Sequence, residues 1–299
     1  MNHIYSESSK YDQLSLERTV KGLSNLGIRQ PPLTWEKAKR WAKQFNDGPE
    51  KALAWLILRF LVFRTTEQLE SSFRQAIKSA SQHFGEKIEL PKETDWRAIL
   101  NGDIGNLSFY CSPPTLNTHN LPGKSGELIA RLVNRTFGVN KSYAYDFTVM
   151  REDERLLIVD DGTFTGEQLD GFLASYGPAK NYPEQIAIVV AIAHEEAISK
   201  LAKQHPGIAV FFGEMLLKAH CFEHLAQAWI SNGLWPYPES HPTDVYKAIC
   251  EKHKLLNGSS GSLGFGSLGV IVGYEHGIPD DSLSILWSKS ETWLPLIER

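Results

Sequence analysis

The chain has 299 residues, of which 42% are hydrophobic and 22% are charged, and its formal net charge is -4. These values are typical of a globular protein with a substantial core and argue against a disordered chain. The 23 Gly and 15 Pro show no period, which excludes collagen-like and repeat architectures.

The cysteines and the apolar runs indicate a cellular compartment. Cys111, Cys221 and Cys250 form no CxxC pair and no disulfide framework, as expected of a protein in a reducing cytoplasm. The polar N-terminus lacks the apolar stretch of a signal peptide. The most apolar run, Ala52–Phe63, is too short to span a bilayer. We therefore expect a cytoplasmic protein without a membrane segment.

Charge is distributed unevenly along the chain. Residues 1–100 carry a net charge of +4, and residues 101–299 carry -8. No run of Lys or Arg is typical of a nucleic-acid-binding arm, so the composition gives little support for unaided binding to DNA or RNA.

The first third of the chain is predicted to be helical. Hydrophobic residues between positions 35 and 45 recur at intervals of three and four, and Thr34 is a candidate N-cap. A second helix is predicted over residues 50–64. A third helix passes through Leu69 and Ala80 and would end at Gly85. We therefore predict a helical N-terminal domain over residues 1–100 that serves as a docking or cap region.

From about residue 105, predicted strands alternate with predicted helices. The strands are expected at Leu107–Cys111, Tyr143–Met150, Leu156–Val159, Ile186–Ala193, Ile208–Phe212 and Val270–Gly273. The helices are expected at Ser125–Arg135, Glu167–Tyr176, His194–Gln204 and Glu214–Ile230. This alternation predicts an α/β domain over residues 101–299, with a doubly wound and mostly parallel sheet. A Gly- and Ser-rich loop is expected at residues 257–269.

The most informative local feature is an acidic pair, Asp160 and Asp161, at the end of an apolar strand. The loop Gly162–Gly166 follows and leads into a helix. Ligands of open α/β sheets bind beyond the carboxyl ends of the strands. The loop amides and the positive end of the helix dipole can hold a phosphate, aided by the hydroxyls of Thr163 and Thr165. Because carboxylates accept hydrogen bonds from vicinal hydroxyls, the pattern suits a ribose 5-phosphate.

Two other interpretations of this segment remain open. One is a capped helix without a ligand, in which Asp161 or Thr165 is the N-cap. The other is a two-component receiver domain, which also begins with an apolar strand and an acidic pair. A receiver needs a phosphoacceptor Asp at the end of a later strand, whereas the strand here ends in Phe212 and Gly213.

The stretch from Val159 to Gly166 resembles the PRPP-binding motif of type I phosphoribosyltransferases. The resemblance implies that Asp160 and Asp161 hold the ribose hydroxyls. It further implies that the 5-phosphate is bound by Gly162, Thr163, Phe164, Thr165 and Gly166. Glu167 and Gln168 stand where many members of the family have Gly and Thr.

A second element of that family precedes the first. Lys124, Ser125 and Gly126 stand between a predicted strand and a predicted helix, where type I enzymes have their pyrophosphate loop. Without the downstream motif, this segment is equally well explained as a capped helix. The resemblance implies that Lys124 acts with Asp160 and Asp161 in catalysis. It also implies that Mg²⁺ is held through oxygens of the substrate rather than by direct protein ligands.

More of the chain resembles one branch of this family, the bacterial conflict-system phosphoribosyltransferase-like proteins, some of which accompany retrons. The resemblance is carried by residues 125–133, 160–168 and 274–287. It implies an anti-phage effector with glycosyltransferase chemistry that transfers or cleaves ribosyl phosphate. The alternative is a non-catalytic module that senses PRPP or a nucleotide. A protein or RNA–protein partner would dock on residues 1–100, and a homo-oligomer is compatible with the sequence.

Three further motifs have simpler explanations. His220 and His224 fit an HxxEH string, and on one helix they would share a face as zinc ligands do, although an amphipathic helix also explains them. The segment His194–Glu196 follows a buried strand, where helix capping is favoured over a role in the substrate pocket. Asp280 and Asp281, beside a proline, are predicted to form a turn.

Overall fold

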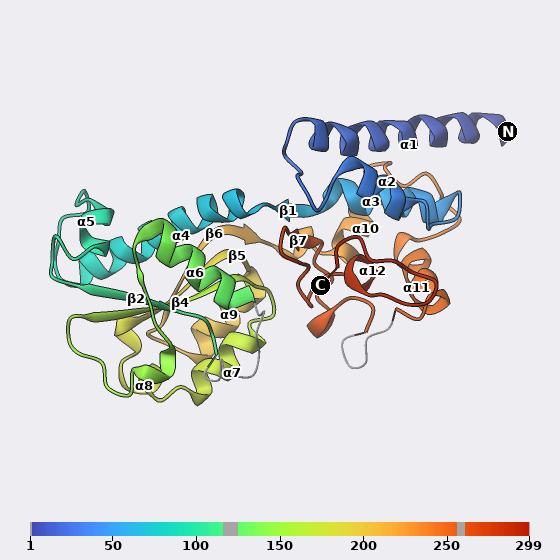
Figure 1. Cartoon of the computed structure of the whole chain (residues 1–299). Helices are drawn as coiled ribbons and strands as arrows, with labels where there is room; N and C mark the ends of the chain where they lie inside the picture. Colours follow the sequence, from blue (N-terminus) through green and yellow to red (C-terminus); the bar gives the residue numbers. More distant parts are fainter. Residues whose placement is uncertain (1, 116–124, 256–260, 299) are drawn as a thin grey trace. The chain divides into compact units, whose positions relative to one another are not determined.

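The computed structural model describes residues 2–115, 125–255 and 261–298, with side chains from Gln13 onward. The chain forms two compact units (Figure 1). One, here called the α/β unit, consists of residues 67–217. The other, here called the helical unit, combines residues 1–66 with residues 218–299.

The α/β unit contains a five-stranded sheet in the order β3-β2-β4-β5-β6, and every neighbouring pair is parallel. The strands are β2 (Ser108–Ser112), β3 (Asn140–Lys141), β4 (Glu154–Thr163), β5 (Ile186–His194) and β6 (Ala209–Leu216). The sheet confirms the predicted α/β class with a parallel sheet. The apolar β5 is buried along its whole length, as a central parallel strand must be.

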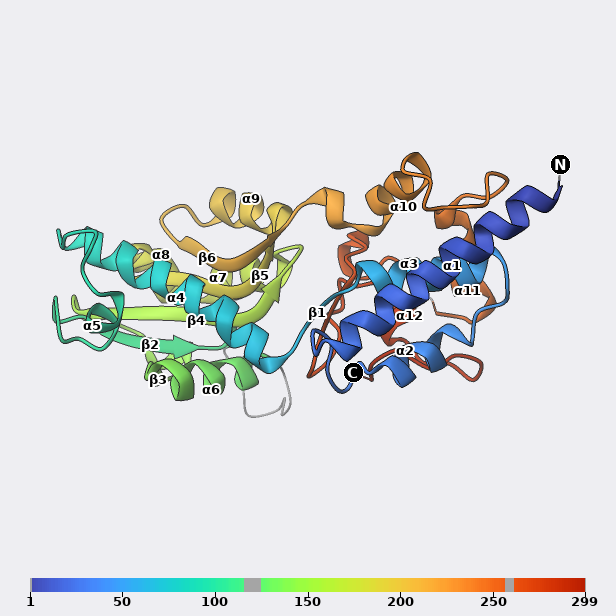
Figure 2. The same cartoon turned by 90° about the horizontal axis from the view of Figure 1, so that it is seen from above.

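Helices cover both faces of this sheet (Figure 2). On one face lie α4 (Thr66–Lys87) and α6 (Ser125–Phe137), joined by a 2.9 Å hydrogen bond from Thr136 Oγ1 to Glu70 Oε1. The other face packs against α7 (Glu167–Ser175), α8 (Gly177–Asn181) and α9 (Glu195–Gln204). The short α5 (Trp96–Leu100) follows α4.

The strand order determines where a ligand would bind. From β2 the chain passes through α6 to β3 on one side, whereas from β4 it passes through α7 to β5 on the other. The two connections therefore diverge between β2 and β4, which makes this point the topological switch point of the sheet. Ligand sites of doubly wound sheets lie there, beyond the carboxyl ends of the strands.

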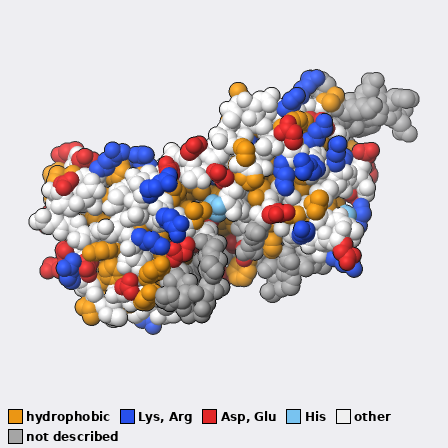
Figure 3. Space-filling view, in the orientation of Figure 1, with side chains coloured by type: hydrophobic (Ala, Val, Ile, Leu, Met, Phe, Trp, Pro, Cys, Tyr) orange, Lys and Arg blue, Asp and Glu red, His pale blue; other side chains and the backbone are white. Residues whose placement is uncertain are grey.

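The helical unit joins the two ends of the chain. Its N-terminal elements are α1 (Asn2–Asn25), α2 (Trp35–Ala42), α3 (Pro49–Phe60) and β1 (Val62–Arg64). Its C-terminal elements are α10 (Phe222–Ser231), α11 (Pro242–Lys252), β7 (Val272–Tyr274) and α12 (Ser284–Trp287). β1 pairs in parallel with β7. Lys and Arg side chains gather over the N-terminal helices on the face shown in Figure 3, in agreement with the net charge of residues 1–100.

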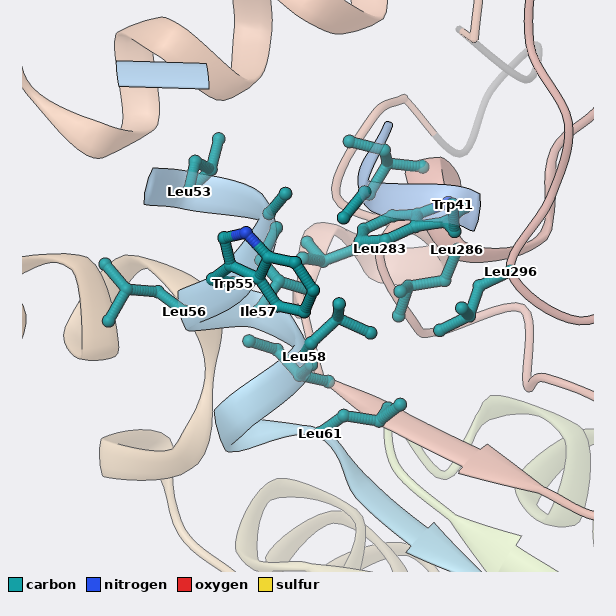
Figure 4. Close-up of a cluster of buried hydrophobic side chains, with 14 of the residues drawn as sticks. Trp41, Leu53, Trp55, Leu56, Ile57, Leu58, Leu61, Leu283, Leu286 and Leu296 are labelled. Carbon is teal, nitrogen blue, oxygen red and sulfur yellow. The ribbon is translucent and has the colours of Figure 1, made fainter. Parts of the chain in front are cut away.

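One hydrophobic core holds these elements together. Trp41 and Phe45 meet Trp293 with ring centroids 6.1 and 5.0 Å apart. The buried side chains of α3 face leucines of the C-terminal segment, among them Leu283 and Leu286 (Figure 4). Aromatic groups of this size contribute strongly to core stability.

The boundary between the two units does not fall at residue 100, because this core joins the two ends of the chain. Residues 67–100 belong to the α/β unit, and residues 218–299 belong to the helical unit. The difference has a physical reason. Contacts such as that between Trp41 and Trp293 join positions far apart in the sequence, and hydrophobic periodicity reports only on neighbours within one element.

Two predictions for the N-terminal helices were wrong in detail. The helix predicted over residues 50–64 ends at Phe60, because Val62–Arg64 pairs with β7. Gly85 does not end α4, which continues to Lys87. A Cβ at Gly85 would lie 2.8 Å from Ile99 Cδ1, so this glycine gives room to a packed side chain instead.

Two predictions in the second half were also wrong. The strand expected at Tyr143–Met150 is replaced by a short 3-10 turn at Ala144–Asp146. The helix expected over Glu214–Ile230 begins only at Phe222, because β6 extends to Leu216. For β6, hydrogen bonding to β5 through Leu216 overrode the local helical pattern. The Gly- and Ser-rich loop lies in part, at residues 256–260, outside the described residues.

All three cysteines are buried free thiols, in agreement with the absence of a disulfide framework in the sequence. Within the described ranges, no helix combines the length and the apolar character needed to cross a bilayer.

Candidate functional site

The acidic pair lies within the last four residues of β4. The strand continues to Thr163, so the loop predicted at Gly162–Gly166 is shorter than expected and consists of residues 164–166. Asp160 is in register with Val190 of β5, and Thr163 is in register with Ala193. The pair therefore stands at the carboxyl edge of the sheet, on a strand that borders the switch point.

The Asp160 carboxylate connects three segments. Its side chain is only 5% exposed. Oδ1 accepts hydrogen bonds from the Asp161 amide at 3.0 Å and from Ser125 Oγ at 3.4 Å, and Oδ2 accepts one from Gln168 Nε2 at 3.4 Å. The structure thus brings together the first residue of α6, the acidic pair and the first turn of α7. Lys124, the remaining residue predicted here, lies outside the described residues.

Burial raises the pKa of Asp160 well above its ordinary value, and the neighbouring Asp161 carboxylate raises it further. Both effects disfavour the charged form. When the folded state has the higher pKa, it binds more protons than the unfolded state between the two pKa values. The free energy of unfolding therefore falls as the pH rises through that window.

We expect Asp160→Asn to flatten this pH dependence and to raise the free energy of unfolding at neutral pH. An amide keeps the acceptor oxygen for the Asp161 amide but carries no buried charge. Denaturant unfolding of both proteins between pH 5 and pH 8 measures the difference. Asp103→Asn, at an exposed position of the same unit, is the control. Parallel stability curves for wild type and Asp160→Asn would show that burial of this charge has no energetic consequence.

Asp161 and the residues after it differ in accessibility. Asp161, Gly162 and Thr165 are partly exposed, whereas the Thr163 and Phe164 side chains are 6% and 4% exposed. Phe164 can therefore contribute only its backbone to ligand binding. Of the two adjacent carboxylates, Asp161 is the one accessible to a ligand.

Gly166 shapes the start of α7. It is the N-cap, with φ +76°, and a Cβ at this position would lie 3.2 Å from Ala197 Cα on α9. Only glycine combines this backbone conformation with so close an approach. The N-cap position of α7 is occupied by Gly166, so the proposal that Asp161 or Thr165 is its N-cap was wrong. Because glycine has no side chain, the N-cap itself offers no acceptor to the first amides of the helix, which suits an anion-binding helix start.

Each of the two helix starts carries a Glu–Lys ion pair. At α7, Lys200 Nζ of α9 lies 2.5 Å from Glu167 Oε1 and 3.6 Å from Asp170 Oδ2. The hydrogen bond to Glu167 raises the pKa of Lys200. At α6, Lys141 Nζ lies 2.5 Å from Glu127 Oε2. Both glutamates, which by themselves would repel an anion, are thus neutralised.

Gln168, Lys141 and Lys200 are site residues that no motif in the sequence indicated. Gln168 was notable only as a departure from the family motif. Lys141 of β3 reaches the start of α6, and Lys200 of α9 reaches the start of α7, so each contact joins two different elements. No local spacing signals such a contact.

The histidine motifs of the sequence have structural explanations. His194 is the buried N-cap of α9 and accepts a hydrogen bond from the Glu196 amide at 3.2 Å, which supports the capping role. His220 ends a short 3-10 segment whereas His224 lies in α10, so the two do not share one α-helix as zinc ligands would. Among the described residues, no group of three or more His, Cys, Asp or Glu could hold a metal ion.

The predicted turn at Asp280 and Asp281 is present, because the Ser282 amide donates to the Pro279 carbonyl at 3.0 Å.

A separate cavity of about 460 Å³ lies at the amino end of β2, lined in part by Asn101, Asn106 and Asn140. It opens at the sheet edge opposite to the acidic pair, so the two features are distinct.

A five-stranded parallel sheet with an acidic pair and two helix starts at its switch point defines a phosphoribosyltransferase-like α/β protein. The chain matches the family model PRTase-CE over residues 38–299 and belongs to this family. The match spans most of both compact units, so the helical unit is part of the family architecture. No curated protein matches the chain.

Proposed function

We propose that the protein is an enzyme that binds PRPP or a nucleotide at the carboxyl edge of β4 and transfers or cleaves ribosyl phosphate. The observation that carries this proposal is the Asp160 carboxylate, which joins the starts of α6 and α7 through Ser125 and Gln168. Two helix starts beside one acidic pair suit a ligand with a sugar diol between two anionic ends.

Each part of the site has a chemical role in this proposal. Asp161 accepts hydrogen bonds from the ribose hydroxyls. The backbone amides around Thr165 and Gly166 hold the 5-phosphate. Ser125 and Gly126, together with Lys124, stabilise the diphosphate as it departs.

The reaction is a displacement at C1 of the ribose. With PRPP, the bond from C1 to the diphosphate oxygen breaks and a bond from C1 to a base nitrogen or a water oxygen forms, with loss of a proton from the attacking group. With a nucleotide, the bond from C1 to the base nitrogen breaks, a bond from C1 to a water oxygen forms, and the leaving base takes up a proton. The carboxylate and phosphate oxygens at this edge are ligands that Mg²⁺ prefers, so the site suits an ion held mainly through the diphosphate and water. Such an ion would neutralise charge on the leaving group.

Calorimetry and product analysis test the proposal. The purified full chain is titrated with PRPP in the presence of Mg²⁺, and the release of diphosphate and of free base from PRPP and nucleotides is measured. We expect binding and release by the wild type, and neither by the Asp160→Asn/Asp161→Asn double variant with an unchanged circular dichroism spectrum. Binding without release would favour the sensing module. Absence of binding by the wild type would contradict both functions.

We further propose that this activity serves an anti-phage defence system in the cytoplasm, with a protein or RNA–protein partner docked on the helical unit. The docking part of this proposal is supported by the exposed basic side chains Lys39, Arg40 and Lys43 of the helical unit. The defence part is what the resemblance to the conflict-system branch implies. Deletion of residues 1–100 would also remove Trp41 from the core and part of the α/β unit. Charge reversal of these three side chains is therefore the appropriate test in a pull-down from cells. Retention of every partner would argue against this docking surface.

A further inference from the structure

The two helix starts at the acidic pair share an electrostatic arrangement. α6 has Glu127 in its first turn and α7 has Glu167, and each carboxylate lies 2.5 Å from a lysine of another element. A first-turn carboxylate stabilises an empty helix but repels an incoming anion. A lysine beside it offsets that repulsion and supplies a cation at the position where the anion binds.

We propose that Lys141 and Lys200 are the cations for the two anionic ends of the ligand, with Lys141 at the diphosphate and Lys200 at the 5-phosphate. Glu127 and Glu167 hold the two ammonium groups in place while the site is empty. This inference rests on the proposed function and adds two ligand-binding residues to it.

The backbone fixes the place of Lys200. Gly166 packs against Ala197, as shown by the 3.2 Å from its would-be Cβ to Ala197 Cα. Lys200 lies three residues further along α9 and therefore on the same side of that helix. Its side chain is 24% exposed, so the ammonium group is partly shielded beside the start of α7.

The position of Lys141 is fixed by β3, which lies on the opposite side of the switch point from α9. This lysine is the last residue of β3 and is in register with Cys111 of β2. Its Nζ lies 5.2 Å from the centre of the Tyr143 ring, and its side chain is 26% exposed. The first turn of α6, which Lys141 reaches, is also held closely, because a Cβ at Gly126 would lie 3.0 Å from Pro113 Cβ.

The Glu127 carboxylate also has an unused acceptor. Its Oε1 is buried and has no hydrogen-bond partner among the residues that the structure describes. A buried acceptor without a donor is costly. Water or a cation carried by a diphosphate would satisfy it, in agreement with the assignment of Lys141 to that end of the ligand.

Crossed titrations of the full-length protein test the proposal. Lys141→Met and Lys200→Met are each titrated with ribose 5-phosphate, inorganic diphosphate and PRPP in the presence of Mg²⁺. We expect Lys200→Met to weaken ribose 5-phosphate binding about fivefold and to leave diphosphate unchanged, with the reverse for Lys141→Met. Both variants should weaken PRPP. Lys180→Met, at an exposed position of α8, is the matched control and should change none of these affinities.

A second substitution separates electrostatics from structural damage. Adding Glu167→Gln to Lys200→Met removes the repelling charge, so it should recover part of the ribose 5-phosphate affinity. Failure of the wild type to bind any of the three compounds would overturn the proposed function and this inference with it. Wild-type binding with unchanged affinities in both lysine variants, or with equal losses for every ligand, would overturn the inference alone.

Discussion

Asp161→Asn is expected to lower kcat/KM for PRPP about a hundredfold without lowering the free energy of unfolding, because the substitution removes a charge that repels the buried Asp160 carboxylate. Asp161 is the accessible member of the acidic pair, and its carboxylate is the group proposed to hold the ribose hydroxyls as positive charge develops at C1. An amide keeps the size of the side chain but lacks the negative charge. Diphosphate release under steady-state conditions measures the effect.

Two comparisons make this result interpretable. Asp103→Asn removes a carboxylate from an exposed position of the same unit and should leave turnover unchanged. Asp160→Asn replaces the carboxylate that accepts from Ser125 and Gln168. Full activity of Asp161→Asn, combined with loss of activity in Asp160→Asn, would place the ligand contact on the buried carboxylate instead.

Gly213→Ala is expected to lower the free energy of unfolding of the α/β unit by about 3 kcal/mol. Gly213 lies in β6 directly against the backbone of α4. A Cβ there would lie 2.3 Å from the Ser72 carbonyl oxygen and 2.6 Å from Ser72 Cα. The hydrogen bond from Ser72 Oγ to Glu214 Oε1, at 2.8 Å, holds the same two segments together, so the helix cannot move away without losing it.

Chemical denaturation measures this effect, and the chain offers a matched control. Gly171 lies in α7, and a Cβ there would meet no described atom within 4 Å. Gly171→Ala should therefore raise the free energy of unfolding by about 0.5 kcal/mol, because alanine is the better helix former. Equal effects of the two substitutions would mean that β6 and α4 are not in the close contact described.

Short-range patterns in the sequence were sufficient for much of the α/β unit. The acidic pair, the turn after it and α7 form one continuous segment, and their spacing predicted the strand, the turn and the helix in the correct order. The apolar run of β5 likewise predicted a strand covered on both faces. These features depend on side-chain periodicity and backbone propensity within a few residues, which a single sequence records directly.

The sequence by itself determined the chemistry of the candidate site: two carboxylates, a small-residue turn and a helix start. The tertiary structure decided which of the two carboxylates is accessible to a ligand. Two adjacent aspartates look identical in the sequence, yet Asp160 is buried among Ser125 and Gln168 whereas Asp161 is accessible. Packing also brought Lys141 and Lys200 to the two helix starts and joined residues 1–66 to residues 218–299 in one core. Each of these outcomes depends on burial and on contacts between distant positions, and these exist only once the chain has folded.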